Sequence, residues 1–215
     1  MTSVEAFYEC FNVYNTTWFP VSIISWLALI ICTYFLFTRP GDKINVLMKI
    51  CLAFIFIWNG AVFFFMYMKN SAIPGGIPML AAGILFTVDI FRDKIRFQLP
   101  EEKCHKYFVL SLTVWALVLY TLVGWLIGHP YPKGPLPVAP CPMTIFTIAL
   151  LSTSMITLSK DRIPFTLLFI LLLWWAFFAG FGAPLFFGFY VDLTLLMAGI
   201  YGLVMLIRNW KVAGK

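Results

Sequence analysis

Long apolar runs constrain this chain more than any other feature of its sequence. Seven blocks, most of them close to the length of about twenty residues that crosses a bilayer as a helix, lie at residues 18–37, 45–68, 74–91, 107–127, 143–158, 163–182 and 184–208. With 62% hydrophobic and 11% charged residues, the chain has too little polar surface for a water-soluble core. We therefore predict an all-α membrane protein with seven transmembrane helices, whose principal partner is the lipid bilayer.

The basic residues are divided unevenly between the two sides that alternating loops would occupy. Of the 15 lysines and arginines, only Lys69 and Lys133 fall on one side. Because basic loops are retained in the cytoplasm, we expect the N-terminus outside and the C-terminus inside, in the inner (cytoplasmic) membrane of a cell. The basic residues stand at helix ends rather than in one patch, which argues against a nucleic-acid partner.

Two apolar segments resemble each other and suggest an internal repeat. AGILFTVDIFR from Ala82 and AGIYGLVMLIR from Ala198 share Ala, Gly, Ile, Val and Arg at equal spacing, and Trp58 falls on Trp174 at the same offset. These matches suggest a 3+1+3 parallel repeat within a single bundle of residues 1–215: repeats 18–96 and 143–212 with the linker helix 107–127 between them. Chance similarity between apolar sequences is the alternative.

Few polar side chains lie inside the predicted helices, so each of them is a candidate for function. Asp192 lies about eight residues into the last block, roughly 12 Å deep at 1.5 Å per residue, and an acid inside a membrane usually marks a binding site or a path for ions. Asn59 lies at a similar depth and could donate a hydrogen bond to Asp192, with Tyr190 as a second donor. A purely structural polar cluster is the other interpretation.

The fifth and sixth blocks supply further candidates. Thr144 and Thr147 lie on one helical face and could line a polar path, although bonding to their own helix backbone explains them equally well. The run AGFGAP, residues 179–184, predicts a tight turn into the last helix. At the basic side, Asp89 is expected to form an interfacial ion pair with Arg92, and Lys49 to extend its ammonium group to the membrane surface.

Two external segments surround the predicted outer mouth of the bundle. Residues 1–17 should form a short amphipathic helix on the membrane surface, and the six prolines of residues 128–142 predict a stiff external cap. Cys10 and Cys141 could form a disulfide there, or His129 and Cys141 could hold a soft metal ion with Cys10 or Glu9. The spacing of these four residues matches no recognised metal motif.

Three short motifs are similar to a known family: TTWFP from Thr16, IWNG from Ile57 and PCPMTIFTIALL from Pro140. Together they resemble an uncharacterised prokaryotic family of seven-helix inner-membrane proteins, a domain of unknown function whose members are often labelled permease. The resemblance covers almost the whole chain. It implies the fold and the membrane but no established activity.

These observations favour a transporter or channel for a small solute or ion, with an outward polar cavity around Asp192. The alternative is a membrane-embedded sensor, receptor or enzyme that binds a ligand or metal at the His129 and Cys141 loop. No catalytic residue is assigned, and an enzyme is the less favoured class. No cofactor is expected, and retinal is disfavoured because no lysine lies between Pro184 and Arg208 to form a Schiff base.

Overall fold

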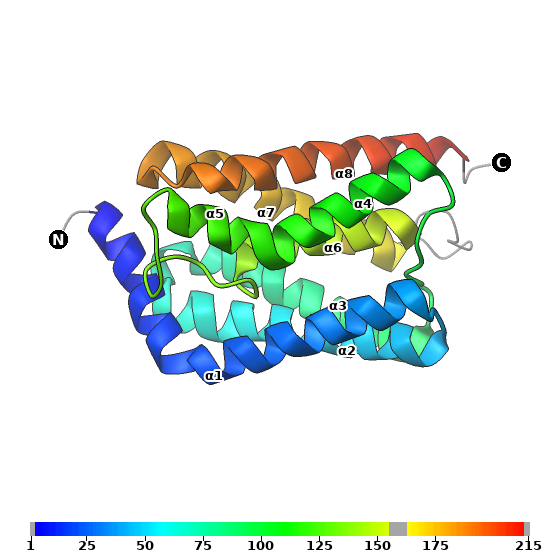
Figure 1. The fold of residues 1–215 in the computed structure, drawn as a ribbon, viewed down its shortest axis with the longest axis horizontal. Coiled ribbons are helices and arrows are strands. Elements are labelled where there is room, and N and C mark those ends of the chain that lie inside the picture. Colours follow the sequence, from blue (N-terminus) through cyan, green and yellow to red (C-terminus); the bar gives the residue numbers. More distant parts are fainter. Residues whose placement is uncertain (1–2, 155–162, 213–215) are drawn as a thin grey trace.

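Each apolar block of the sequence gives a helix, because the amides of an apolar segment find their hydrogen-bond partners within it. The computed structural model describes residues 3–154 and 163–212, and these residues contain helices and no strand (Figure 1). The helices are α1 (Ser3–Thr38), α2 (Asp42–Trp58), α3 (Ile77–Arg92), α4 (Lys103–Val114), α5 (Tyr120–Leu126), α6 (Pro140–Ser154), α7 (Ile163–Phe187) and α8 (Leu193–Val212). Short π-helical and 3-10 segments extend α2 to Tyr67, precede α3 from Lys69 and join α4 to α5.

Six of the helical segments are long and apolar enough to cross a membrane. They are Ser3–Thr38, Asp42–Tyr67, Lys69–Arg92, Lys103–Leu126, Phe165–Phe187 and Tyr190–Asn209. The seventh, Pro140–Ser154, is apolar but shorter over the part that the structure describes. The expected all-α membrane fold is therefore confirmed, and the end of the predicted block 143–158 lies outside the described residues.

The two ends of the bundle differ in their connections (Figure 1). The N-terminus, the loop between α5 and α6 and the turn between α7 and α8 lie at one end, here called the loop end. The C-terminus and the connections from α1 to α2 and from α3 to α4 lie at the other, here called the basic end. The connection from α2 to α3, which contains Lys69, also lies at the loop end, as does the α5–α6 loop with Lys133, and the alternation of the blocks predicts this.

Helix α1 bends sharply and so consists of two arms. Trp18 has non-helical dihedral angles (φ −112°, ψ 20°), and Pro20 follows two residues later. Proline has no N–H and its ring collides with the carbonyl of the preceding turn, so a kink is expected here. The arm before the kink lies across the loop end, while the arm after it runs along the bundle (Figure 1). The predicted N-terminal helix therefore exists, as the first arm of α1.

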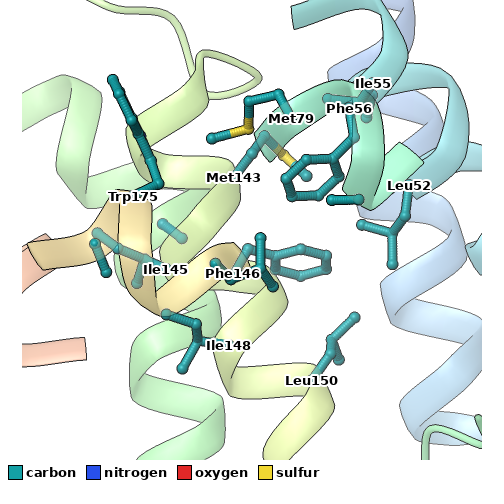
Figure 2. Packing of buried hydrophobic residues seen from close by; sticks show 14 of the residues in the cluster. Leu52, Ile55, Phe56, Met79, Met143, Ile145, Phe146, Ile148, Leu150 and Trp175 are labelled. Carbon is teal, nitrogen blue, oxygen red and sulfur yellow. The ribbon is translucent and has the colours of Figure 1, made fainter. Parts of the chain in front are cut away.

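Helix α6 lies at the centre of the bundle. It packs against α4, α7 and α8, and of its residues only Cys141 is not fully buried. Its side chains Met143 and Phe146 lie on the side of Leu52, Phe56 and Met79 from α2 and α3, whereas Ile145 lies on the side of α7 (Figure 2). Four of its hydroxyls, those of Thr144, Thr147, Ser152 and Thr153, bond to carbonyls of their own turns, so they can be buried without water.

The proline-rich loop does not stay outside the bundle. Residues 134–140 are all buried, so the loop turns inward and α6 begins inside the protein. This corrects the expectation of a cap lying wholly at the surface. The physical reason is visible in the Pro-Cys-Pro motif: Pro140 and Pro142 have no N–H, and Met143 N–H donates to Ala139 O at 3.1 Å. Few orphan donors remain at this helix start, so it can be buried at little cost.

The break between the last two helices also differs from the sequence-based expectation. Helix α7 continues through Pro184 to Phe187, and the chain turns at Gly188, whose φ of +68° is readily adopted only by glycine. Gly180 permits close helix packing instead of a turn, because a Cβ there would lie 2.8 Å from Leu196 N. The run AGFGAP thus lies within α7, and its Gly180 forms part of the α7–α8 contact.

Candidate functional site

Asp192 lies at the start of α8, in a 3-10 turn that spans Tyr190–Asp192. The sequence placed it two turns into its helix, and this depth is corrected because the turn comes at Gly188 rather than at Pro184. The side chain is nevertheless buried, with Asp192 2% exposed. A carboxylate in the first turn of a helix is favoured by the helix dipole, so its position at this terminus partly offsets its burial.

Two side chains from different elements hold the carboxyl group of Asp192. The hydroxyl of Tyr120, at the start of α5, donates to Oδ1. The thiol of Cys141, at the start of α6, donates to Oδ2 at 3.4 Å. Tyr120 itself is fully buried. The three helices α5, α6 and α8 therefore converge on one acid through their terminal residues.

No cation balances this acid within the part of the chain that the structure describes. The ion pairs recorded among those residues all lie around Lys49 and Arg96 at the basic end, and Asp192 takes part in none of them. Both donors to its carboxyl group are neutral. An ionised Asp192 would thus be a buried charge without an opposite charge nearby, which is costly in a low-dielectric site.

The predicted partners of Asp192 lie elsewhere. Asn59 is buried, but its amide donates to Val138 O at 2.9 Å and holds the inward loop against the end of α2. Its Oδ1 has no hydrogen-bond partner. Tyr190 is 63% exposed and points away from the interior. Spacing along the chain indicated the depth of Asn59 and Tyr190 only approximately. It could not identify Tyr120, because the packing of α5 brings that residue to Asp192.

Thr144 and Thr147 also bind within their own helix. Thr144 donates to Pro140 O at 2.8 Å and Thr147 to Met143 O at 2.7 Å. Both are completely buried, and neither lines the cavity described next. The geometry therefore favours bonding of these two hydroxyls to their own helix backbone over a role in a polar path.

A cavity of about 430 Å³ opens beside Asp192 at the loop end. Its walls come from several elements: the first arm of α1, the end of α2, the inward loop and the second half of α7. Most of the lining is aromatic or aliphatic, and the polar groups at its inner side are Tyr120, Cys141 and Asp192. The cavity is therefore an apolar chamber with one polar spot, which differs from the polar cavity that the sequence suggested.

The mouth of the cavity lies among exposed apolar side chains of α7. Phe178, Phe181, Leu185 and Phe186 all line the cavity and are all exposed. On a membrane-spanning helix such side chains face lipid. A second pocket, of about 250 Å³, adjoins the cavity and extends past Lys69, Asn70 and Ser71 at the end of the bundle. The chamber can thus be approached from the lipid side and from the loop end.

The first arm of α1 closes part of the chamber. Phe7 stacks on Phe187 with ring centroids 4.2 Å apart, and Tyr8 OH donates to Phe187 O at 3.1 Å. Further along the arm, the Asn15 amide donates to Pro132 O and Gly134 O at 2.7 and 2.8 Å. These contacts join the arm to α7 and to the inward loop, so it forms a lid over both.

The four residues considered for a metal or disulfide have separate partners. His129 stacks on Tyr8, Cys10 donates to Tyr67 O, Glu9 accepts from Asn12, and Cys141 bonds to Asp192. Cys10 and Cys141 are free thiols. Among the described residues no group of three or more potential metal ligands occurs.

His129 has a structural role in this arrangement. Its ring packs between Tyr8 and Phe189, at centroid distances of 4.7 and 5.1 Å. Partial burial lowers the pKa of His129 below its usual value, which favours the neutral imidazole at neutral pH. A neutral ring suits the aromatic stack that it completes.

A second charged cluster lies at the basic end. Lys49 is fully buried, and its Nζ lies 2.8 Å from both Asp89 Oδ2 and Asp93 Oδ1. The expected extension of Lys49 to the membrane surface is therefore wrong: two carboxylates hold it inside. Asp89 also accepts the backbone N–H groups of Lys94 and Ile95, so this cluster fixes the chain that leaves α3.

Within residues 3–154 and 163–212, six long apolar helices and the central apolar helix α6 define a multi-pass α-helical membrane protein. Residues 4–214 match DUF6064, a family of unknown function, and the chain belongs to that family. This match confirms the expectation that an uncharacterised family covers almost the whole chain. No curated protein and no solved structure matches the chain.

Proposed function

We propose that the protein moves a small, largely apolar solute across the membrane and binds it in the cavity beside Asp192. The observation that carries this proposal is the entry of non-helical backbone, residues 134–139, into a bundle of membrane helices next to a buried acid. Within a bilayer such backbone is tolerated where it is enclosed by protein or lines a cavity. Many transporters place their binding sites beside non-helical backbone at membrane depth, and here a connecting loop supplies it.

The position of the cavity supports access from one side at a time. The chamber and its neighbouring pocket lie at the loop end. Beyond Asp192, the centre of the bundle is filled by the apolar core around α6, with Met143, Ile145 and Phe146 completely buried (Figure 2). A site open toward one end and closed toward the other is what alternating access requires.

Matching helix contacts support a duplicated, rocking architecture. The hairpin of α2 and α3 packs Gly60 against Leu80, where a Cβ would lie 2.9 Å from the backbone nitrogen. The hairpin of α7 and α8 packs Gly180 against Leu196, with a corresponding distance of 2.8 Å. Leu80 and Leu196 are separated by the same offset as the two similar segments of the sequence, whereas Gly60 and Gly180 are separated by about one helical turn more. Two halves built alike can move against each other about a shared site.

The membrane and the orientation belong to the same proposal. The basic end would face the cytoplasm and the loop end the outside of the cell membrane, because lysine and arginine are retained inside. The chamber would then be open to the outside and to the outer half of the bilayer.

Transport can be tested before the solute is identified. Proteoliposomes would be incubated in a small-molecule cell extract, washed, and their contents compared by mass spectrometry with those of protein-free liposomes. We expect at least one compound to accumulate with the natural protein and not with Asp192→Asn. Asp42→Asn is the matched control, since Asp42 is an exposed carboxylate at the opposite end.

The outcome also separates transport from the alternative class. Equal contents in all preparations, with correctly folded protein, would contradict transport. A compound that copurifies with the protein but never enters the liposomes would indicate a receptor or sensor. Chemical conversion of an extract compound would indicate a membrane-embedded enzyme.

A further inference from the structure

We propose that the solute recognised by this cavity is an organic cation with an apolar body, and that its positive charge is placed beside Asp192. This inference names the class of ligand for the site proposed above and rests on that site being a binding site. It does not require that binding lead to transport.

The charge of the site is the first argument. Asp192 can carry one negative charge, its two hydrogen-bond donors are the neutral groups of Tyr120 and Cys141, and no ion pair to it occurs among the described residues. Lys69 lines the neighbouring pocket rather than this cavity. A buried carboxylate without a counter-charge is stabilised by a proton or by a bound cation. The cavity beside Asp192 is large enough and open enough to admit a cationic ligand, which could supply the missing positive charge.

The walls of the cavity are the second argument. Aromatic rings attract a cation placed over their faces, and the effect grows when the site excludes water. The rings that line this cavity come from α1, the π-helical extension of α2, α5, α7 and the turn before α8, and they include Phe11, Phe63, Tyr120, Trp175, Phe177 and Phe189. An anion would meet the electron-rich faces of these rings as well as the carboxylate. The lining therefore favours a positively charged ligand over a negatively charged one.

The size and the mouth of the cavity are the third argument. About 430 Å³ lies within the range of roughly 300–1,000 Å³ typical of sites for drug-sized molecules. It is far larger than a bare metal ion needs, and the polar spot occupies only its inner side. The exposed apolar side chains at the mouth, such as Leu185 and Phe186, suit a ligand that partitions into lipid. A ring or chain joined to an ammonium group has these properties.

A pair of probes of the same shape isolates the charge. Benzyltrimethylammonium carries the cation, and neopentylbenzene replaces its nitrogen by carbon. Binding to the detergent-solubilised full chain would be followed by isothermal titration calorimetry. We expect the cation to bind at least about tenfold more tightly than the neutral probe, as a desolvated cation in an aromatic site with a counter-charge should. Equal affinity, or no binding of the cation, would overturn the proposal.

Variants identify the groups responsible. Asp192→Asn keeps the shape of the side chain and should remove the preference for the cation, whereas Asp42→Asn should leave both affinities unchanged. Should Asp192→Asn fail to fold, Phe11→Leu provides a second test, because it removes one ring face while keeping an apolar side chain. Phe11→Leu should weaken the binding of the cation about threefold and the binding of the neutral probe by less. The same loss of affinity for both probes would contradict the proposal.

Failure of this inference and failure of the proposed transport are distinguishable. Selective binding of the cation without accumulation of any compound in liposomes would support the proposed ligand class and contradict transport. Accumulation of an uncharged or anionic compound, together with equal affinity for the two probes, would support transport and contradict the proposed ligand class.

Discussion

The fully buried Lys49 shows how single residues in this protein depend on contacts that lie far away in the sequence. Its partner Asp89 comes from α3, and Asp93 from the residues that follow it. Helical spacing suggested Arg92 as a partner for Asp89 and a surface position for Lys49. Neither expectation included the packing of α2 against α3, which brings the lysine and the carboxylates together.

Asp93 should make the stability of this cluster depend on pH. The hydrogen bond from Lys49 holds the pKa of Asp93 below its usual range, with Arg96 contributing in the same direction. A carboxyl group whose pKa is depressed by folding stabilises the protein above its unfolded pKa of about 3.9 and loses this effect as the pH falls through the folded value. We expect the melting temperature of the natural protein to fall more steeply below about pH 4 than that of Asp93→Asn.

Thermal melts in detergent between neutral and acidic pH would check this expectation. Glu101→Gln serves as the control, because Glu101 is an exposed carboxylate near the same loop. Parallel curves for the natural protein and Asp93→Asn would show that Asp93 contributes nothing to the pH dependence.

At the scale of elements, glycine decides how closely the helices of each hairpin approach. Gly180 and Gly182 lie in the same stretch of α7, yet their surroundings differ. A Cβ at Gly180 would meet the backbone of Leu196 at 2.8 Å, whereas a Cβ at Gly182 would have only the ring of Phe186 nearby, at 3.8 Å. The two positions therefore form a matched pair for substitution.

Gly180→Ala should destabilise the protein, since the clash involves backbone that cannot rotate away. Overpacking of this kind costs about 1–3 kcal/mol. Gly182→Ala should instead be neutral or stabilising by up to about 1 kcal/mol, because alanine favours the helix. Denaturation in mixed detergent would measure both, and similar effects of the two substitutions would show that α7 and α8 are not packed as described.

At the scale of the whole molecule, the charge asymmetry predicts one orientation in the membrane. A reporter enzyme that is active only in the cytoplasm, fused after Lys215, should be active, and a reporter active only outside should be silent there. The converse pair, inserted in the exposed part of the α5–α6 loop at Lys133, should give the opposite result. A silent cytoplasmic reporter at the C-terminus would contradict the orientation drawn from the lysines and arginines.

The sequence was sufficient for the class of fold but only partly for the site. Hydropathy alone located the six long apolar helices and α6 as far as the structure describes it, since an apolar segment must satisfy its own backbone in lipid. The acid Asp192 was identified because charge inside a membrane is rare. Its partners Tyr120 and Cys141 were not identified as such, because they lie on other helices and their approach depends on tertiary packing. The inward course of residues 134–139 was missed for a related reason: prolines indicate an extended backbone, but not which way it runs.

The burial of α6 has a consequence for how this protein is made. Its surroundings include α7 and α8, which follow it in the chain. While the ribosome is still producing those segments, the inward loop already has its partners Asn15 and Asn59, but the sides of α6 that face α7 and α8 have no final neighbours. The central helix can therefore pack first against α4 and completes its packing only near the end of synthesis, when the last two helices are made.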